Sequence, residues 1–425
     1  MDTSGLQTSL WGATARPAPP TAKLLGSHRT AVLIVGGGFT GCSTALHLAK
    51  AGTDVIVLEG SEIGFGASGR NVGMVNAAPS LLPAEVLRRL PAPFGERLLN
   101  GLATSPALVR SLVAEHDIEC SIGGRGIVKV AHSRAGLSGI REMVAQWRAR
   151  GAAIDLLTPE EIAQVTGRKH SFGGMIDHRN FILQPLSYVR GLGAAAIAAG
   201  ARIFTESRVV GLSRVGAHWM ARTALGTVIA EKVLVCTGAY STDLIPGLVS
   251  SFTPVGCFLL ATTPLREDIR RCALPDRDIS FIDSQRALHF ARCDDSQRLI
   301  VGALGWLPEA RSAEGWARRT LRDFFPQLPD VQFDFAWTGN IDLTDDHLPW
   351  LARPQPNLHA IGGFNGRGIG AGTYLGGVLS AWLRGLPDDE LPLPVKLMPR
   401  IRFRRIKQTF YSNAFKATRL LNRFC

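Results

Sequence analysis

The chain has 425 residues, of which 46% are hydrophobic, so it can bury a large core, and its length is typical of about two domains. Its seven cysteines are scattered and form no Cys-x-x-Cys pair, which indicates neither a disulfide framework nor a zinc site and favours a reducing compartment. The first residues lack a signal-peptide pattern, and every apolar window is far shorter than the roughly 20 residues that span a bilayer. We therefore expect a cytoplasmic protein without a transmembrane helix.

The net charge of +12 would ordinarily point to nucleic acid or an anionic membrane as a partner. Residues 395–425 contain nine basic side chains and no acidic one, so most of this charge belongs to one terminal segment. The body of the chain is close to neutral, and no nucleic-acid partner is expected.

The beginning of the chain predicts an arm followed by a β-α-β unit. Residues 1–29 are polar and proline-punctuated without periodicity, and we assign residues 1–26 to an N-terminal arm. Residues 31–35 form a short apolar strand, residues 40–51 have apolar side chains at helical spacing, and residues 54–58 form a second buried strand. This order predicts a parallel sheet.

The middle of the chain alternates between helical and extended patterns. Residues 81–117 are helical in pattern, with breaks expected at Pro91, Pro93 and Pro106, and residues 118–130 predict a strand pair around a Gly-Gly-Arg-Gly turn. A helix is expected over residues 185–199, followed by short strands to residue 235. Further strands are expected within residues 252–303 and 331–343, a helix over 313–325, and a strand-turn-helix unit over 358–383.

A dinucleotide-binding fingerprint occupies residues 31–59. Gly36 permits a tight turn after the strand, Gly38 lets backbone amides approach a pyrophosphate, and Gly41 lets the helix lie close to the strand. Glu59 ends the second strand, where a carboxylate accepts hydrogen bonds from a ribose. The glycine pattern alone is a weak indication, but here both strands, the helix and the acid fall in register.

Three further segments follow the fingerprint, and the first of them indicates a bulky ligand. The glycine-rich loop at residues 63–76 favours a backbone lying along a flat ligand over a plain surface turn, and Ser68 is placed to donate to a phosphate. Residues 232–240 run as a strand into Thr237 and Gly238, which read alone is simply a core strand. Residues 359–373 repeat a strand, a glycine-rich turn and a helix N-terminus, which would stabilise an anionic group.

In this order and spacing, the four segments resemble the D-amino-acid-oxidase-like FAD-dependent oxidoreductases over roughly residues 8–394. The similarity is greatest to the gamma-glutamylputrescine oxidase branch, through residues 9–17, 66–71 and 363–368. The resemblance implies an α/β (α+β overall) fold in which a Rossmann-type, glutathione-reductase-like FAD domain is interleaved with a mixed-sheet substrate domain. The implied FAD domain spans residues 27–80, 185–245 and 345–394, and the implied substrate domain spans residues 81–184 and 246–344.

By the same resemblance, residues of these four segments and a fifth group, Val209 and Val210, bind the cofactor. Val209 and Val210 would pass near the adenine, and Arg70 and Asn71 would face the flavin or the substrate. The full set of expected FAD-binding residues is Gly36, Gly38, Gly41, Glu59, Ala67, Ser68, Gly69, Arg70, Asn71, Val210, Thr237, Gly238, Gly366, Arg367, Gly368 and Ile369.

The chain departs from the family pattern at three positions. Val72 replaces a small residue and narrows the space near the ring, and Gly370 stands where sarcosine oxidases have a lysine that binds the substrate carboxylate. No cysteine lies around Trp337, where sarcosine oxidases link the flavin, so noncovalent FAD is expected.

The candidate catalytic residues are Arg70, Asn71 and His289. His178 and His347 are further candidates to accept a proton, although for each histidine a hydrogen-bonded structural role is the stronger alternative. Arg125 and Arg292 are candidates to pair with a substrate anion, against the alternative of a solvated surface arginine, which is favoured for each.

Two other groups are assigned no chemistry. Asp342, Asp345 and Asp346 do not have the spacing of an EF-hand, so we expect no metal. Cys236 has no charged neighbour in the sequence that would lower its pKa, so it reads as a small buried residue.

The resemblance implies oxidation of the CH–NH bond of a small amine or amino-acid derivative by hydride transfer to flavin N5, with oxygen or a respiratory carrier as electron acceptor. The alternatives are FAD-dependent oxidation of a 2-hydroxy acid, and a flavin-binding protein without this catalysis. An NAD-dependent dehydrogenase would share the first fingerprint but gives no reason for the later glycine-rich segments.

The C-terminal segment, residues 395–425, predicts a basic amphipathic helix. Such a helix packs on the protein's own FAD domain or a second subunit, which is the favoured interpretation, or lies on the inner face of a membrane as a peripheral contact. Its expected apolar stripe is Phe403, Ile406, Phe410, Ala414, Ala417, Leu421 and Phe424.

Overall fold

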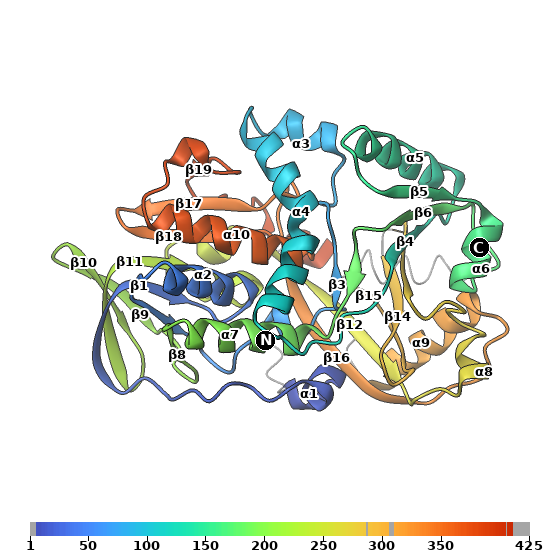
Figure 1. The fold of residues 1–425 in the computed structure, drawn as a ribbon, viewed down its shortest axis with the longest axis horizontal. Helices are drawn as coiled ribbons and strands as arrows, with labels where there is room; N and C mark the ends of the chain where they lie inside the picture. Colours follow the sequence, from blue (N-terminus) through green and yellow to red (C-terminus); the bar gives the residue numbers. More distant parts are fainter. Residues whose placement is uncertain (1–5, 286–287, 306–309, 405, 411–425) are drawn as a thin grey trace.

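The structure is a computed structural model that describes residues 6–285, 288–305, 310–404 and 406–410. Two large β-sheets lie side by side, the first on the left of Figure 1 and the second on the right. Across the described residues, no helix is both long and apolar enough to cross a membrane.

The first sheet has nine strands in the order β19-β17-β18-β11-β1-β2-β8, with the antiparallel strands β9 and β10 joined to β11. Its parallel centre is buried on both faces, which explains why β2 reads as the uninterrupted apolar run Val-Ile-Val-Leu. The strands are β1 (Gly26–Val35), β2 (Val55–Leu58), β8 (Arg202–Phe204), β9 (Gly211–Val215), β10 (His218–Arg222), β11 (Gly226–Val235), β17 (Trp350–Gln355), β18 (Leu358–Gly362) and β19 (Val395–Lys396).

Three helices, α2 (Phe39–Lys50), α7 (Pro185–Ala198) and α10 (Gly368–Leu383), pack together against one face of the first sheet (Figure 1). Small residues permit this close packing, since a side chain at Gly376 would begin 2.5 Å from the Ser43 side chain of α2. On the opposite face, buried side chains of the central strands share a hydrophobic cluster with Trp219 and Ala221 of β10.

The second sheet has eight strands in the order β16-β12-β15-β14-β13-β4-β6-β5, and all its pairings except β4 with β13 are antiparallel. Helix α9 (Ala310–Phe324) covers one face through Trp316, and the other face turns toward the first sheet. The strands are β4 (Gly126–Val130), β5 (Ile154–Leu157), β6 (Gly174–Asp177), β12 (Thr253–Thr262), β13 (Ile279–Asp283), β14 (His289–Cys293), β15 (Leu299–Leu304) and β16 (Phe333–Leu343).

Shorter elements complete the chain. Strands β3 (Met74–Val75) and β7 (Phe181–Ile182) pair between the two sheets. The remaining α-helices are α1 (Leu10–Thr14), α3 (Pro83–Arg89), α4 (Phe94–Glu115), α5 (Arg134–Arg148), α6 (Pro159–Thr166) and α8 (Glu267–Arg270).

The predicted β-α-β unit and the mixed α/β class are confirmed, but three local predictions are wrong. Helix α4 continues through Pro106, although proline has no backbone N–H to donate within the helix. No strand pair surrounds the Gly-Gly-Arg-Gly turn within the described residues, since Gly123 instead bridges to Ile182. The N-terminal arm is not irregular, because it forms α1 and buries Trp11.

The two sheets draw on separate stretches of the chain. Strands of the first sheet come from residues 26–58, 202–235, 350–362 and 395–396, and strands of the second come from residues 126–177 and 253–343. Strand β19 pairs with β17, so Val395 and Lys396 belong to the sheet and the predicted C-terminal segment begins inside the folded body.

Candidate active site

A cavity of about 560 Å³ lies between the two sheets, which is within the usual size of small-molecule and cofactor sites. One wall is formed by the turns that follow the carboxyl ends of β1, β2, β11 and β18, where parallel α/β sheets bind ligands. The facing wall is the second sheet, which contributes Lys129, Cys257, Ile282, Phe290 and Leu304.

The turn from β1 into α2 depends on glycine at two positions. Gly36 has a φ of +112°, and a side chain there would begin 2.9 Å from the Cys236 carbonyl oxygen. A side chain at Gly41 would begin 1.9 Å from the Gly36 carbonyl oxygen. The helix therefore starts close against the strand, and its N-terminus lines the cavity.

Glu59 lies at the end of β2, beside this turn. Its Oε2 accepts a hydrogen bond from the Gly37 amide at 2.7 Å, and its Oε1 accepts one from the Ser61 amide at 2.9 Å. Burial raises the pKa of the Glu59 carboxyl, while the two amides and nearby Arg208 act in the opposite direction. Arg208 also lines the cavity.

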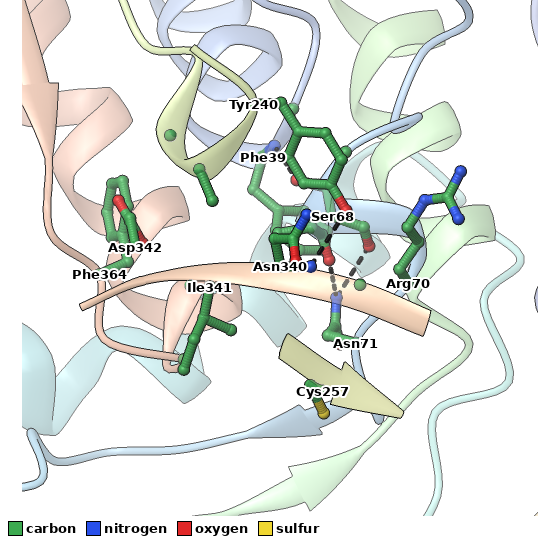
Figure 2. Close-up of a pocket in the computed structure, with 18 of the residues that line it drawn as sticks. Phe39, Ser68, Arg70, Asn71, Tyr240, Cys257, Asn340, Ile341, Asp342 and Phe364 are labelled. Carbon is green, nitrogen blue, oxygen red and sulfur yellow. Dashed lines mark hydrogen bonds between the residues drawn. The ribbon is translucent and has the colours of Figure 1, made fainter. Parts of the chain in front are cut away.

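The loop over residues 63–76 is joined to the N-terminus of α2 by Ser68, whose Oγ accepts a hydrogen bond from the Phe39 amide at 3.0 Å (Figure 2). Asn71 holds the loop internally, because its Nδ2 donates to the Ala67 and Ser68 carbonyls and its Oδ1 accepts from the Gly73 amide. The amide group of Asn71 is thus used within the loop, and a catalytic role for it is not supported by this position.

Arg70 points away from the cavity in Figure 2, although it contributes to its lining. Its Nε donates to the Phe65 carbonyl at 2.9 Å and its Nη1 to the Thr338 carbonyl at 3.3 Å. The guanidinium also lies 4.8 Å from the centre of the Phe65 ring. This arrangement corrects the expectation that the Arg70 side chain faces the substrate, since it ties the loop to β16.

A brace behind the loop comes from distant parts of the chain. Trp11 Nε1 donates to the Asn71 carbonyl at 2.7 Å, and Trp337 Nε1 donates to the Arg70 carbonyl at 3.1 Å. Arg292 Nη1 donates to the Leu183 carbonyl at 2.8 Å and to the Val72 carbonyl at 3.1 Å. Arg292 is therefore a buried structural residue and not a surface arginine or a candidate for a substrate anion.

The turn after β11 meets the end of β16 on the other side of the cavity. Tyr240 accepts a hydrogen bond at its hydroxyl from the Asn340 amide at 3.2 Å (Figure 2). Asp342 Oδ2 accepts one from the Gly363 amide at 2.7 Å, and burial raises the pKa of the Asp342 carboxyl to about 6. Asp342 thus joins β16 to the glycine-rich turn before α10.

Two basic side chains face the cavity from opposite walls. Lys129 lies in the middle of β4, and Arg367 is the N-cap residue of α10, with its Nη1 donating to the Ala78 carbonyl at 2.8 Å. Burial, and then the charge of Arg367, lowers the pKa of Lys129 to about 8, and burial lowers the pKa of Arg367 to about 10. Among the described residues, no carboxylate forms an ion pair with either side chain.

Most of the expected cofactor residues lie together at this cavity, and three do not line it. Gly41 and Gly69 are packed behind it, and Val210 is 59% exposed while its neighbour Val209 lines the wall. The expected residues that line the cavity are Gly36, Gly38, Glu59, Ala67, Ser68, Arg70, Asn71, Thr237, Gly238, Gly366, Arg367, Gly368 and Ile369.

His289 lies outside the cavity, which corrects its assignment as a catalytic residue. Alternate residues of a strand face opposite sides of the sheet, so Phe290 lines the cavity while His289 stacks on Trp316 beneath α9. There, His289 Nδ1 lies 2.8 Å from the buried Asp283 carboxylate.

The remaining candidate residues lie partly outside the cavity and partly at its wall. His178 is paired with Asp155 and Arg125 with Asp276, and neither lines the cavity. His347 does line it, and burial followed by the charge of nearby Arg89 lowers its pKa. Cys236 is partly buried, and burial raises its pKa to about 12.

Lys129, Arg208, Tyr240 and Asn340 were not predicted from the sequence. Lys129 carried a usable indication, because it is the charged residue in the apolar strand Gly-Ile-Val-Lys-Val. In that strand it shares a face with Ile127, which packs toward the first sheet, while Val128 and Val130 pack on the opposite side. A lone charge on such an inward face is costly unless it serves a ligand.

The cavity's chemistry fits FAD. The N-terminus of α2 at Gly38 suits a pyrophosphate, and the Glu59 carboxylate at the end of β2 suits a ribose. The second glycine-rich turn, at the start of α10, adds further backbone amides to the lining of the cavity.

Comparison with known proteins gives a consistent result. Residues 31–382 match the model of the DAO family, described as FAD dependent oxidoreductase. The chain is 30% identical over 420 residues to the gamma-glutamylputrescine oxidoreductase of Escherichia coli, covering 95% of this chain and 97% of that protein. It is 28% identical to the probable oxidoreductase OrdL of Haemophilus influenzae, covering 84% of this chain and 83% of that protein.

Solved structures share the fold. The glycine oxidase of Geobacillus kaustophilus superposes with a TM-score of 0.69 at 22% identity, covering 84% of this chain and 94% of that one. The L-amino acid deaminase of Proteus myxofaciens superposes with a TM-score of 0.72 at 14% identity, covering 88% of this chain and 93% of that one. The matched fingerprint, the two-sheet architecture and the family match together show that this chain belongs to the DAO family of FAD-dependent oxidoreductases.

Proposed function

We propose that this enzyme oxidises the CH–NH bond of a small amine or amino-acid derivative, using FAD that is bound noncovalently. When bound, FAD supplies the acceptor for the hydride that leaves the substrate carbon. The nitrogen loses a proton as the C=N bond forms, so the product is an imine. The relatives that act on a putrescine derivative and on glycine, by their names, support this class of substrate.

The residues proposed to hold FAD follow the length of the cavity. The Gly38 amide at the N-terminus of α2, together with Ser68, would bind the pyrophosphate, and Glu59, held by the Gly37 amide, would bind the ribose beside Arg208. The flavin would lie between the loop carrying Asn71 and the turn over residues 366–369. Noncovalent binding predicts that acid precipitation releases all the flavin, whereas colour that stays with the pellet would contradict it.

The pair formed by Lys129 and Arg367 carries the proposal about the substrate. Lys129 and Arg367 are half-buried and neither is ion-paired with a carboxylate, although the charge of Asp177 acts on Arg367. Two such cations at one cavity favour a substrate that brings an anionic group, such as the carboxylate of an amino-acid derivative. The same positive charges disfavour an ammonium ion beside them. They would therefore favour the neutral amine, which is the form that can be oxidised.

The side chains of the second sheet that line the cavity would control the access of water to the substrate. Ile282, Phe290 and Leu304 form an apolar surface on the second sheet that would exclude water from the reacting carbon. With His289 beneath α9 and the Asn71 amide engaged in its loop, no acid-base pair is assigned to the reaction, and the enzyme acts by orienting and desolvating the substrate.

Anaerobic mixing of the holoenzyme with candidate substrates tests this proposal. Gamma-glutamylputrescine, glycine and N-substituted amino acids represent the amine class, and lactate represents the 2-hydroxy acids. We expect loss of the oxidised-flavin absorbance with a member of the first group only. Reduction of the flavin by lactate alone would instead show that the enzyme oxidises a 2-hydroxy acid.

The acceptor that reoxidises the flavin is either oxygen or a respiratory carrier, and the rate of reoxidation by air, measured against that by a soluble quinone, distinguishes them. A carrier dissolved in a membrane would require this enzyme to reach a bilayer.

A further inference from the structure

The most exposed large apolar side chains of the described chain are gathered in its C-terminal segment. Leu397 is 83% exposed, Phe403 73%, Ile406 66% and Phe410 65%. The next in rank, Leu25, is 63% exposed and lies at the start of β1. Single exposed apolar residues are common on protein surfaces, but a cluster within one short segment marks an interaction site.

This segment is fixed to the body of the enzyme. Ile401 is buried, and its amide donates to the Ser250 carbonyl at 2.8 Å. Arg404 Nε donates to the Phe252 carbonyl at 2.9 Å, and Lys407 Nζ lies 2.7 Å from Asp345 Oδ1. The apolar side chains are therefore presented from an anchored surface and do not belong to a loose end.

The anchor also places the segment near the active site. Asp345, which binds Lys407, lies in the same loop as His347, and His347 lines the cavity. A binding partner on this segment would thus lie close to the loop that borders the cavity.

The charges beside the apolar residues indicate what docks there. Within the part of the chain that the structure describes, Lys396, Arg400 and Arg402 form no ion pair, and residues 395–425 contain nine basic residues and no acidic one. A second copy of the chain in a two-fold contact would bring these positive surfaces together, which is unfavourable. An anionic bilayer accepts both features, because basic groups stay at the headgroups while apolar side chains enter the interface.

We propose that Leu397, Phe403 and Ile406, flanked by Lys396, Arg400 and Arg402, form a docking surface for an anionic lipid bilayer. The surface holds the enzyme on the membrane as a peripheral protein. This inference does not depend on the identity of the substrate, so the two proposals can fail separately.

Flotation of the full-length holoenzyme with lipid vesicles tests the docking surface. Vesicles of phosphatidylcholine with about a quarter phosphatidylglycerol supply the anionic surface, and vesicles of phosphatidylcholine alone are the control. We expect binding to the anionic vesicles at low salt, weakened by added salt. Phe403→Ser combined with Ile406→Ser should reduce binding about tenfold or more, and Lys396→Gln with Arg400→Gln and Arg402→Gln should abolish the preference for anionic lipid.

A matched control separates the surface from general surface hydrophobicity. Leu25→Ser combined with Leu225→Ser changes two side chains that are 63% and 58% exposed elsewhere, and this variant should float like the unchanged enzyme. Retention of flavin and an unchanged melting temperature show that each variant is folded. Failure of the unchanged enzyme to float at low salt, or equal loss in the control variant, would overturn the proposal. If the unchanged enzyme is a dimer in solution and Phe403→Ser with Ile406→Ser makes it a monomer, the surface contacts a second copy of the chain. That result would also overturn the proposal of a membrane-docking surface.

Discussion

Glu59 Oε2 accepts a hydrogen bond from the Gly37 backbone amide at 2.7 Å, across the turn that opens the first β-α-β unit. This contact fixes the carboxylate at the wall of the cavity. It also joins the two strongest elements of the fingerprint, the glycine turn and the acid at the end of β2.

Glu59→Ala should weaken FAD binding roughly ten- to a hundredfold, because it removes a charge-assisted acceptor that contributes about 1.5–3 kcal/mol. The dissociation constant of FAD from the apoprotein, measured by fluorescence titration, checks this result. Glu206→Ala is the control, since Glu206 pairs with exposed Lys23 and should leave FAD binding unchanged. Equal affinities for Glu59→Ala and the unchanged protein would refute the role of Glu59.

Arg70→Ala should weaken FAD binding about tenfold while leaving the rate of reduction of bound flavin nearly unchanged. The reason is that the guanidinium holds the Phe65 and Thr338 carbonyls of the surrounding frame and points away from the cavity. Titration of the apoprotein and stopped-flow reduction of the FAD-saturated variant measure the two effects. A variant that keeps its FAD affinity but reduces slowly would instead place Arg70 at the substrate.

Trp11 supports the cofactor loop from the N-terminal arm. Trp11→Phe should lower the free energy of unfolding by about 0.5–1.5 kcal/mol, because it removes the hydrogen bond to the Asn71 carbonyl and keeps most of the apolar contact. Trp11→Ala should cost about 3–5 kcal/mol, since it also leaves a cavity beside Trp337. Chemical denaturation of the two variants distinguishes these contributions, and identical losses would exclude the hydrogen bond as a contributor.

Lys129 predicts a pH dependence of anion binding. Its pKa of about 8 means that the ammonium is present below that pH and is lost as the pH rises through it, while Arg367, with a pKa of about 10, stays charged. The affinity for a carboxylate such as acetate, measured by perturbation of the flavin spectrum, should therefore fall from neutral to alkaline pH. Lys129→Met should bind acetate roughly ten- to a hundredfold more weakly at neutral pH and lose this dependence. An unchanged pH profile in Lys129→Met would show that another group controls anion binding.

The sequence was most informative where function depends on local geometry. The turn at Gly36, the helix after it and Glu59 form one contiguous unit, so spacing alone predicts how they meet. The prediction at His289 missed the cavity by a single residue, because adjacent positions in a strand face opposite ways and the pattern did not decide which one turns inward.

Other features were hidden because their partners are distant in the chain. Trp11 reaches the carbonyl of Asn71 and the ring of Trp337, and no local periodicity records such contacts. In the C-terminal segment, the exposure of Phe403, Ile406 and Phe410 argues against one form of the favoured interpretation, packing on the protein's own FAD domain. Its other form, packing on a second subunit, stays a prediction. The rest of the predicted stripe, Ala414, Ala417, Leu421 and Phe424, lies outside the described residues.

Anaerobic reduction of the bound flavin tests the proposed reaction most directly. Mixing the holoenzyme with gamma-glutamylputrescine, glycine or an N-substituted amino acid should remove the oxidised-flavin absorbance with at least one of these amines, and one equivalent of imine-derived carbonyl product should form for each flavin reduced. Lactate should leave the flavin oxidised. Flavin that is reduced by lactate and remains oxidised with every amine would contradict amine oxidation as the function of this enzyme.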